Sequence, residues 1–163
     1  MLMKAGANAI KLEGAAGNVD TIHHIVESGI PVMGHLGLTP QSVFQLGGHK
    51  VQARGIEAAT LLGEQALALE QAGCFSLVLE AIPSETAAQV ARSLAIPVIG
   101  IGAGPDVDGQ VLVLQDLLGI TTTLKPKFVR QWLDGSHLIT EALNEYHREV
   151  VARTFPTAKE SYT

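Results

Sequence analysis

The sequence contains an internal repeat. The matching segments are residues 5–13 (AGANAIKLE) with 72–80 (AGCFSLVLE), and residues 30–34 (IPVMG) with 96–100 (IPVIG). The two spacings, 72 − 5 and 96 − 30, differ by one position, so the whole block recurs. Each block predicts a helix that ends at Ala-Gly, followed by a short apolar strand that ends at Glu. A helical stretch comes next, and then a second strand that begins with Ile-Pro and ends at Gly. Glu13 and Glu80 are therefore predicted to hold equivalent positions.

Strand patterns alternate with helical patterns along the chain. Strands are expected at residues 7–13, 31–35, 75–80, 97–101 and 119–123. Helical periodicity covers residues 19–28, 57–71, 84–94 and 110–118. Near-continuous apolar strands that alternate with helices predict a parallel sheet covered by helices.

The composition predicts a single domain over residues 1–163. Of the residues, 47% are hydrophobic and 17% are charged, which is enough apolar material for a substantial core. From about residue 126 we expect a helical tail that packs on the sheet or on a neighbouring subunit. Five strands are too few for a closed (β/α)8 barrel, which typically takes about 250 residues. The pattern leaves two alternatives, an open sheet or a barrel whose first three strands lie outside this chain.

Charge and hydropathy exclude several kinds of partner. The net charge is −5, no basic cluster is present, and only 4% of the residues are aromatic, so nucleic acid is not expected to bind. No uncharged apolar run approaches the roughly 20 residues that a membrane span needs. The start of the chain lacks the apolar stretch of a signal peptide, and the single cysteine, Cys74, is expected to be a buried small hydrophobe. We therefore expect a cytoplasmic protein.

Candidate catalytic groups stand at the ends of the expected strands. Lys11 and Glu13 are two residues apart, so they project from the same face at the carboxyl end of the first strand, where parallel α/β folds bind ligands. The alternative is a structural ion pair. Glu80 ends the equivalent strand, and an acid in apolar surroundings has the raised proton affinity of a general base or acid. Its alternative is a helix-capping or solvated loop residue.

A histidine follows the second strand. His35 lies between Gly34 and Gly37, two glycines that allow close approach of the backbone to a ligand. Binding of substrate and a structural role are both open for His35.

Several motifs together resemble one enzyme family, ketopantoate hydroxymethyltransferase (3-methyl-2-oxobutanoate hydroxymethyltransferase). In order along the chain they are IKLEG at residues 10–14, GHLGLTPQS at 34–42, GGHKVQ at 47–52, IPVIGIGAG at 96–104 and KPKFV at 125–129. The resemblance covers nearly the whole chain, and GHLGLTPQS followed by GG-x-KVQ is specific to that family.

The resemblance implies a (β/α)8 barrel enzyme of pantothenate and coenzyme A biosynthesis. Such an enzyme transfers a hydroxymethyl group from 5,10-methylenetetrahydrofolate to 3-methyl-2-oxobutanoate, with Mg²⁺ as cofactor, and forms a homo-oligomer. By motif, Lys11 resembles the lysine that holds the keto acid, Glu13 the glutamate at the magnesium site, and Glu80 the base that removes the proton from carbon 3.

The resemblance also implies that a part of the barrel is missing. The family has a further amino-terminal part with the first three strands and two aspartates that ligate magnesium, the first in a Gly-Asp-Ser motif that this chain lacks. We therefore expect about the last five strands of the barrel, with a homo-oligomer or an amino-terminal complementing chain as the partner. The alternatives are an inactive or complementing fragment that lacks the amino-terminal metal ligands, and a related metal-dependent keto-acid aldolase or lyase.

Overall fold

The computed structural model describes residues 3–123 and 125–162. Their contacts group the chain into two compact units, one ending at Val111 and one beginning at Leu112. The single-domain organisation expected from the sequence stays a prediction.

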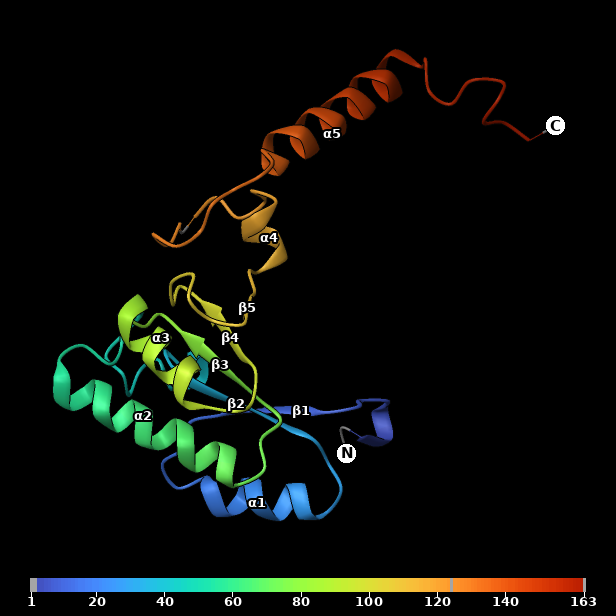
Figure 1. Cartoon of the computed structure of the whole chain (residues 1–163). Helices are drawn as coiled ribbons and strands as arrows, with labels where there is room; N and C mark the ends of the chain where they lie inside the picture. Colours follow the sequence, from blue (N-terminus) through green and yellow to red (C-terminus); the bar gives the residue numbers. More distant parts are fainter. Residues whose placement is uncertain (1–2, 124, 163) are drawn as a thin grey trace. The chain divides into compact units, whose positions relative to one another are not determined.

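The first unit is built on a parallel sheet of five strands in the order β1-β2-β3-β4-β5 (Figure 1). The strands are β1 (Ile10–Glu13), β2 (Val32–Gly37), β3 (Ser76–Glu80), β4 (Val98–Ile101) and β5 (Gly109–Gln110). Every neighbouring pair is parallel. The order of the strands in the sheet is therefore their order in the chain, as for consecutive strands of a (β/α)8 barrel.

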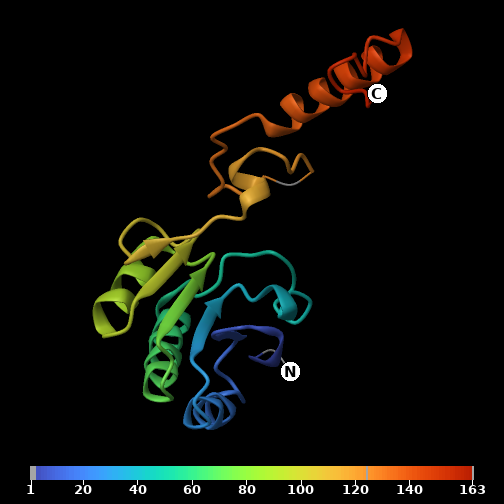
Figure 2. The same ribbon diagram turned by 90° about the vertical axis from the view of Figure 1, so that its right-hand side faces the viewer.

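Three helices cover one face of this sheet (Figure 2). They are α1 (Val19–Glu27), α2 (Ile56–Gln71) and α3 (Ser84–Ser93). Their apolar sides, including Ile22 and Leu69, join the core cluster with alternate strand residues such as Leu77 and Leu79. Because side chains alternate along a strand, the residues between them, such as Val78 and Glu80, face the other side. The sheet therefore has helices on one face and polar groups at the strand ends on the other. This α/β arrangement is consistent with a partial (β/α)8 barrel.

The four strands of the repeat lie where the sequence predicts them, and no end differs by more than three residues. The predicted fifth strand at residues 119–123 is wrong, and β5 forms at Gly109–Gln110 instead. Gly119 follows the short helix α4 (Leu114–Leu117), with a φ of 67° and its N–H donating to the carbonyl of Asp116. A Cβ on Gly119 would lie 2.2 Å from the Leu133 carbonyl oxygen. Gly119 therefore lies at the end of α4, close to the backbone of Leu133, and does not begin a strand.

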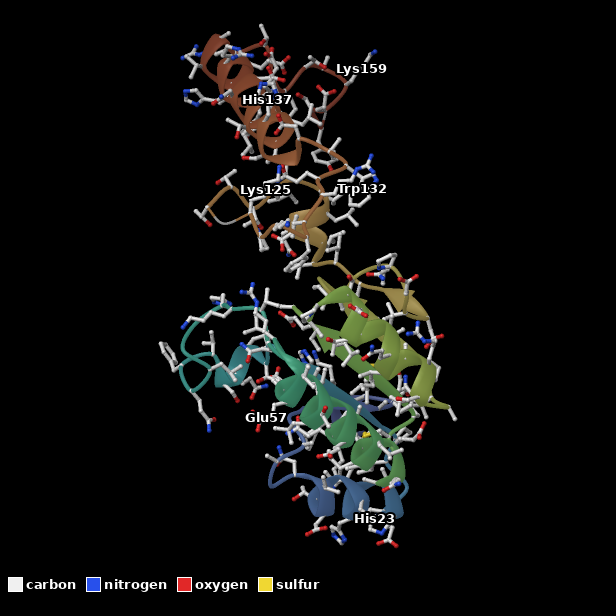
Figure 3. All side chains as sticks on the ribbon, turned by 60° about the vertical axis from the view of Figure 1, so that its left-hand side comes forward. His23, Glu57, Lys125, Trp132, His137 and Lys159 are labelled. Carbon is white, nitrogen blue, oxygen red and sulfur yellow. The ribbon has the colours of Figure 1, made fainter. Side chains whose placement is uncertain are left out.

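The second unit contains α4 and the long helix α5 (Gly135–Ala152). The Asp134 side chain accepts a hydrogen bond from the His137 N–H at 3.3 Å, which caps the start of α5. Ahead of the helix, the guanidinium carbon of Arg130 lies 5.0 Å from the ring centre of Trp132, which Figure 3 labels. Among the described residues, no helix is both long and apolar enough to cross a membrane. Packing of this tail on the sheet or on another subunit stays a prediction.

Candidate active site

Three ionisable side chains gather near the carboxyl ends of β1, β2 and β3. Glu13 ends β1 and lies in register with His35 on β2. Glu80 ends β3 and pairs with Gly37, two residues beyond His35. Because β2 lies between β1 and β3, His35 is placed between the two glutamates.

The imidazole of His35 faces both carboxylates. Its Nε2 lies 3.3 Å from Oε2 of Glu80, and its Nδ1 lies 3.9 Å from Oε1 of Glu13. The His35 side chain is 1% exposed, whereas those of Glu13 and Glu80 are 13% and 16% exposed. The ring is therefore enclosed, and the two acids keep access to the surface.

Neither ring nitrogen of His35 makes a hydrogen bond in the described structure. The 3.3 Å contact with Glu80 is close enough for one but is poorly aligned, and 3.9 Å to Glu13 is too long. Buried polar atoms are nearly always hydrogen-bonded in proteins, so two unpartnered nitrogens on one ring require an explanation. Catalytic hydrogen bonds are often long or misaligned until a ligand binds.

Hydrogen bonds hold both the carboxylate and the backbone of Glu13. The Gln41 N–H donates to Oε2 of Glu13 at 3.1 Å, so the loop after β2 turns back over the end of β1. Asn18 Nδ2 donates to the Glu13 carbonyl at 3.1 Å and to that of Gly14 at 3.4 Å. These contacts fix both the backbone and one carboxylate oxygen of Glu13.

Glu80 is fixed through its backbone alone. Its carbonyl accepts the Leu38 N–H at 2.9 Å, next to Gly37. Gly37 has a φ of 94°, and a Cβ there would lie 2.2 Å from the same carbonyl oxygen. Glycine at position 37 therefore permits the close approach of β2 and β3 beside Glu80. Among the described hydrogen bonds, none ends on a side-chain oxygen of Glu80, in contrast to Glu13.

The structure brings Glu13 and Glu80 together at one end of the sheet and leaves Lys11 apart. Ile10 and Leu12 pack against the core, so Lys11 shares the opposite face with Glu13 as expected from strand alternation. Lys11 is exposed and pairs in register with Met33. Among the ion pairs of the described residues none involves Lys11, so the structural ion pair with Glu13 does not form.

The expected surroundings of Glu80 need correction. The sequence predicts an acid in apolar company, and its neighbour on β4, Ile101, is apolar. On the side of β2, however, the neighbour is the imidazole of His35. Sequence reasoning missed this contact because the two residues are far apart in the chain. The signal was available in the repeat, which makes β2 the strand between the two acids.

The described residues do not form a magnesium site by themselves. No group of three or more His, Cys, Asp or Glu side chains within residues 3–123 and 125–162 could hold a metal ion. Magnesium prefers six oxygen ligands in near-octahedral geometry, and Glu13 would supply a single carboxylate. Further ligands would have to come from outside these residues.

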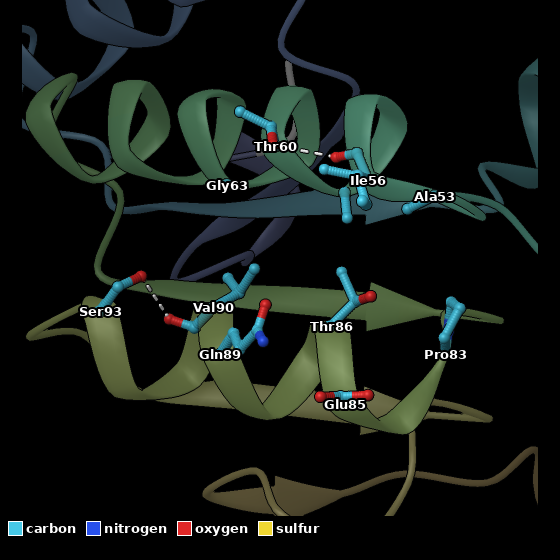
Figure 4. A pocket seen from close by; sticks show the side chains of 12 residues that line it. Ala53, Ile56, Thr60, Gly63, Pro83, Glu85, Thr86, Gln89, Val90 and Ser93 are labelled. Carbon is cyan, nitrogen blue, oxygen red and sulfur yellow. Dashed lines mark hydrogen bonds between the residues drawn. The ribbon is translucent and has the colours of Figure 1, made fainter.

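A separate groove of about 630 Å³ lies between α2 and α3 (Figure 4). The Thr60 hydroxyl donates to Ile56 and the Ser93 hydroxyl donates to Val90, each within its own helix. Other polar side chains of α3 also line the groove. It lies on the helical side of the sheet, whereas the carboxylates of the candidate site stand on the opposite face, so it is not the candidate active site.

Comparison with known proteins agrees with the motifs. A family model described as ketopantoate hydroxymethyltransferase matches residues 1–158. The 3-methyl-2-oxobutanoate hydroxymethyltransferase of Bdellovibrio bacteriovorus is 60% identical over 162 residues, which is 99% of this chain and 62% of the relative. The enzymes of that name from Francisella tularensis (strain SCHU S4) and Coxiella burnetii are each 56% identical, over 99% and 95% of this chain.

The chain spans about three fifths of the length of these relatives, covering 61% of the Francisella protein and 59% of the Coxiella protein. This partial coverage agrees with a sheet of five strands where a closed barrel has eight. The match over nearly all of this chain confirms the resemblance drawn from the motifs. The chain belongs to the ketopantoate hydroxymethyltransferase family.

Proposed function

We propose that this chain supplies part of the active site for hydroxymethyl transfer from 5,10-methylenetetrahydrofolate to 3-methyl-2-oxobutanoate, giving 2-dehydropantoate. The family match supports the class of reaction, and the position of Glu80 supports proton removal by a carboxylate. The activity belongs to a completed protein, because the chain spans 62% of the Bdellovibrio relative.

We assign the role of base to Glu80. Removal of a proton from carbon needs a carboxylate oxygen with a free lone pair near the surface. The side-chain oxygens of Glu80 accept no described hydrogen bond, whereas Oε2 of Glu13 already accepts the Gln41 N–H. Glu80 is therefore the better candidate for the base. Glu13, whose carboxylate is held in place, is the better candidate for a metal ligand.

In the proposed reaction the bond between carbon 3 and its hydrogen breaks. The proton goes to the Glu80 carboxylate and the electron pair forms the enolate. Water hydrolyses the two carbon–nitrogen bonds of the folate methylene group, so its oxygen stays on that carbon as formaldehyde and its two hydrogens go to the two nitrogens of tetrahydrofolate, which leaves. Carbon 3 then attacks this folate-derived carbon, and the resulting alkoxide takes the proton back from Glu80 to become the hydroxyl group. Lys11, exposed on the same face as Glu13, is proposed to bind the keto-acid carboxylate.

Glu13 is proposed as one ligand of a Mg²⁺ ion, which would need further ligands from an amino-terminal part. The two aspartates implied by the family resemblance would be among them. Assembly with such a part, or as a homo-oligomer, belongs to the same proposal.

Complementation tests the proposed function. The chain alone and the chain co-expressed with the amino-terminal part of the Bdellovibrio relative would be assayed for hydroxymethyl transfer over a range of Mg²⁺ concentrations. We expect little transfer from the chain alone and transfer from the complemented protein. Strong transfer by the chain alone, or none after a stable complex forms, would contradict the proposal.

Substitution of Glu80 tests its role. Glu80→Gln in the complemented protein is expected to lower turnover by about 100-fold or more and to leave keto-acid binding largely unchanged, because a base acts in the chemical step. Deuterium exchange at carbon 3 without folate, followed by NMR, isolates that step. Glu85→Gln, the same change at an exposed residue of α3, is the control. If binding is lost while the bound complex still turns over, Glu80 is not the base.

A further inference from the structure

We propose that His35 is a positioning residue that carries its proton on Nε2 and orients the Glu80 carboxylate. The catalytic purpose of the contact between His35 and Glu80 rests on the proposed role of Glu80 as base. The contact itself is a structural observation, the 3.3 Å distance between Nε2 and Oε2.

The burial of His35 argues against direct contact with a substrate. Its side chain is 1% exposed, and both ring nitrogens are inaccessible. This burial comes from the chain's own atoms, so additional protein can only increase it. His35 therefore acts through the residues that surround it.

The distances distinguish the two carboxylates. Nε2 is 3.3 Å from Glu80, so a small rotation of either side chain would make a hydrogen bond. Nδ1 is 3.9 Å from Glu13, and that acid already accepts the Gln41 N–H. A neutral imidazole carries one N–H, so the shorter contact favours the tautomer protonated on Nε2.

Such a bond would give Glu80 the constraint that it otherwise lacks. Its backbone is held by the Leu38 N–H, but its side chain accepts no described hydrogen bond. A donor at Oε2 would fix the plane of the carboxylate and leave Oε1 free for the proton of the substrate. Partners that orient an active group in this way typically contribute about 10- to 100-fold to activity.

The first test uses the 163-residue chain as it is. Two-bond and three-bond ¹⁵N–¹H correlation spectra report which ring nitrogen is protonated, and His35→Gln identifies the signals of His35. We expect an Nε2–H resonance that shifts strongly in Glu80→Gln and weakly in Glu13→Gln. A proton on Nδ1, or a larger response to the Glu13 substitution, would overturn the proposal.

The second test uses two amide side chains that replace one ring nitrogen each. In His35→Gln the amide nitrogen lies near the position of Nε2, and in His35→Asn it lies near that of Nδ1. In the complemented enzyme we expect His35→Asn to lower kcat about 10- to 100-fold with little change in KM for the keto acid, and His35→Gln to retain most of kcat.

Matched controls keep the outcomes distinct. His23, on the outer side of α1 (Figure 3), is 58% exposed, and its Asn and Gln variants should not alter kcat. Equal losses in His35→Asn and His35→Gln would indicate a role in packing alone and would overturn the proposal. Lack of transfer by the complemented wild-type protein would instead contradict the proposed function, and the NMR result would stand independently.

Discussion

The two copies of the repeat share the register of their strand pairs and differ in chemistry. In the first, β1 and β2 place Glu13 opposite His35, and in the second, β3 and β4 place Glu80 opposite Ile101. The pairs are equivalent in register, since each joins the last residue of one strand to the residue after the Ile-Pro-x-x-Gly segment.

The difference shows how strand order turns a repeat into a site. β2 has an acid-bearing strand on each side, so its histidine meets two carboxylates. β4 has β3 on one side and the short β5 on the other, so Ile101 meets only one of the acids. The first position therefore places a polar residue beside two acids, whereas the second places an apolar residue beside one.

The largest effect on stability is expected at Gly37, whose counterpart in the second copy is Ala103. Ala103 does not adopt a positive φ, whereas Gly37 has a φ of 94° and the added Cβ would lie 2.2 Å from the Glu80 carbonyl oxygen. Gly37→Ala should lower the free energy of unfolding by about 3 kcal/mol. Urea denaturation measures this, with Gly48→Ala as control because Gly48 has a φ of 105° and no atom near its Cβ position. Equal losses would mean that the contact with Glu80 is unimportant.

A smaller effect is expected at the glycines that precede β1 and β3. Gly6 and Gly73 have nearly the same φ, 94° and 93°, but a Cβ on Gly73 would lie 2.7 Å from Cγ1 of Val26, and one on Gly6 would meet nothing within 4 Å. We expect Gly73→Ala to lower the free energy of unfolding by about 2 kcal/mol and Gly6→Ala by about 1 kcal/mol. Urea denaturation measures both losses. A larger loss for Gly6→Ala than for Gly73→Ala would show that the contact with Val26 does not determine the difference.

The smallest effect is expected at Cys74, where the first copy has Ala7. Cys74 is buried, and burial raises the pKa of its thiol. Cys74→Ala should lower the free energy of unfolding by about 1 kcal/mol at neutral pH. The folded state holds the thiol proton more tightly than the unfolded state, so wild-type stability falls relative to the variant above about pH 8.5.

Urea denaturation at pH 7 and pH 9.5 measures that difference, and a thiol reagent should label Cys74 slowly until the protein unfolds. A stability difference that is independent of pH, together with rapid labelling of the folded chain, would show that Cys74 is not enclosed.

Much of the fold could be predicted because its signals are local. The helices around residues 19–27, 56–71 and 84–93 and the first four strands follow from hydrophobic period and from glycine or proline at their ends. The fifth strand could not be predicted in this way. Gly119 looks like the start of a strand in sequence, and only its positive φ and its hydrogen bond to the Asp116 carbonyl show that it ends α4.

The sequence by itself determined that two glutamates stand at equivalent strand ends and that Lys11 shares a face with one of them, because strand alternation and the repeat are properties of the chain. Tertiary structure decided that His35 lies between the acids, that the Gln41 N–H holds Glu13, and that Lys11 remains exposed. The physical reason is that these contacts join residues far apart in the chain. They exist only when β2 is paired on both sides and the loop after it folds back over the sheet.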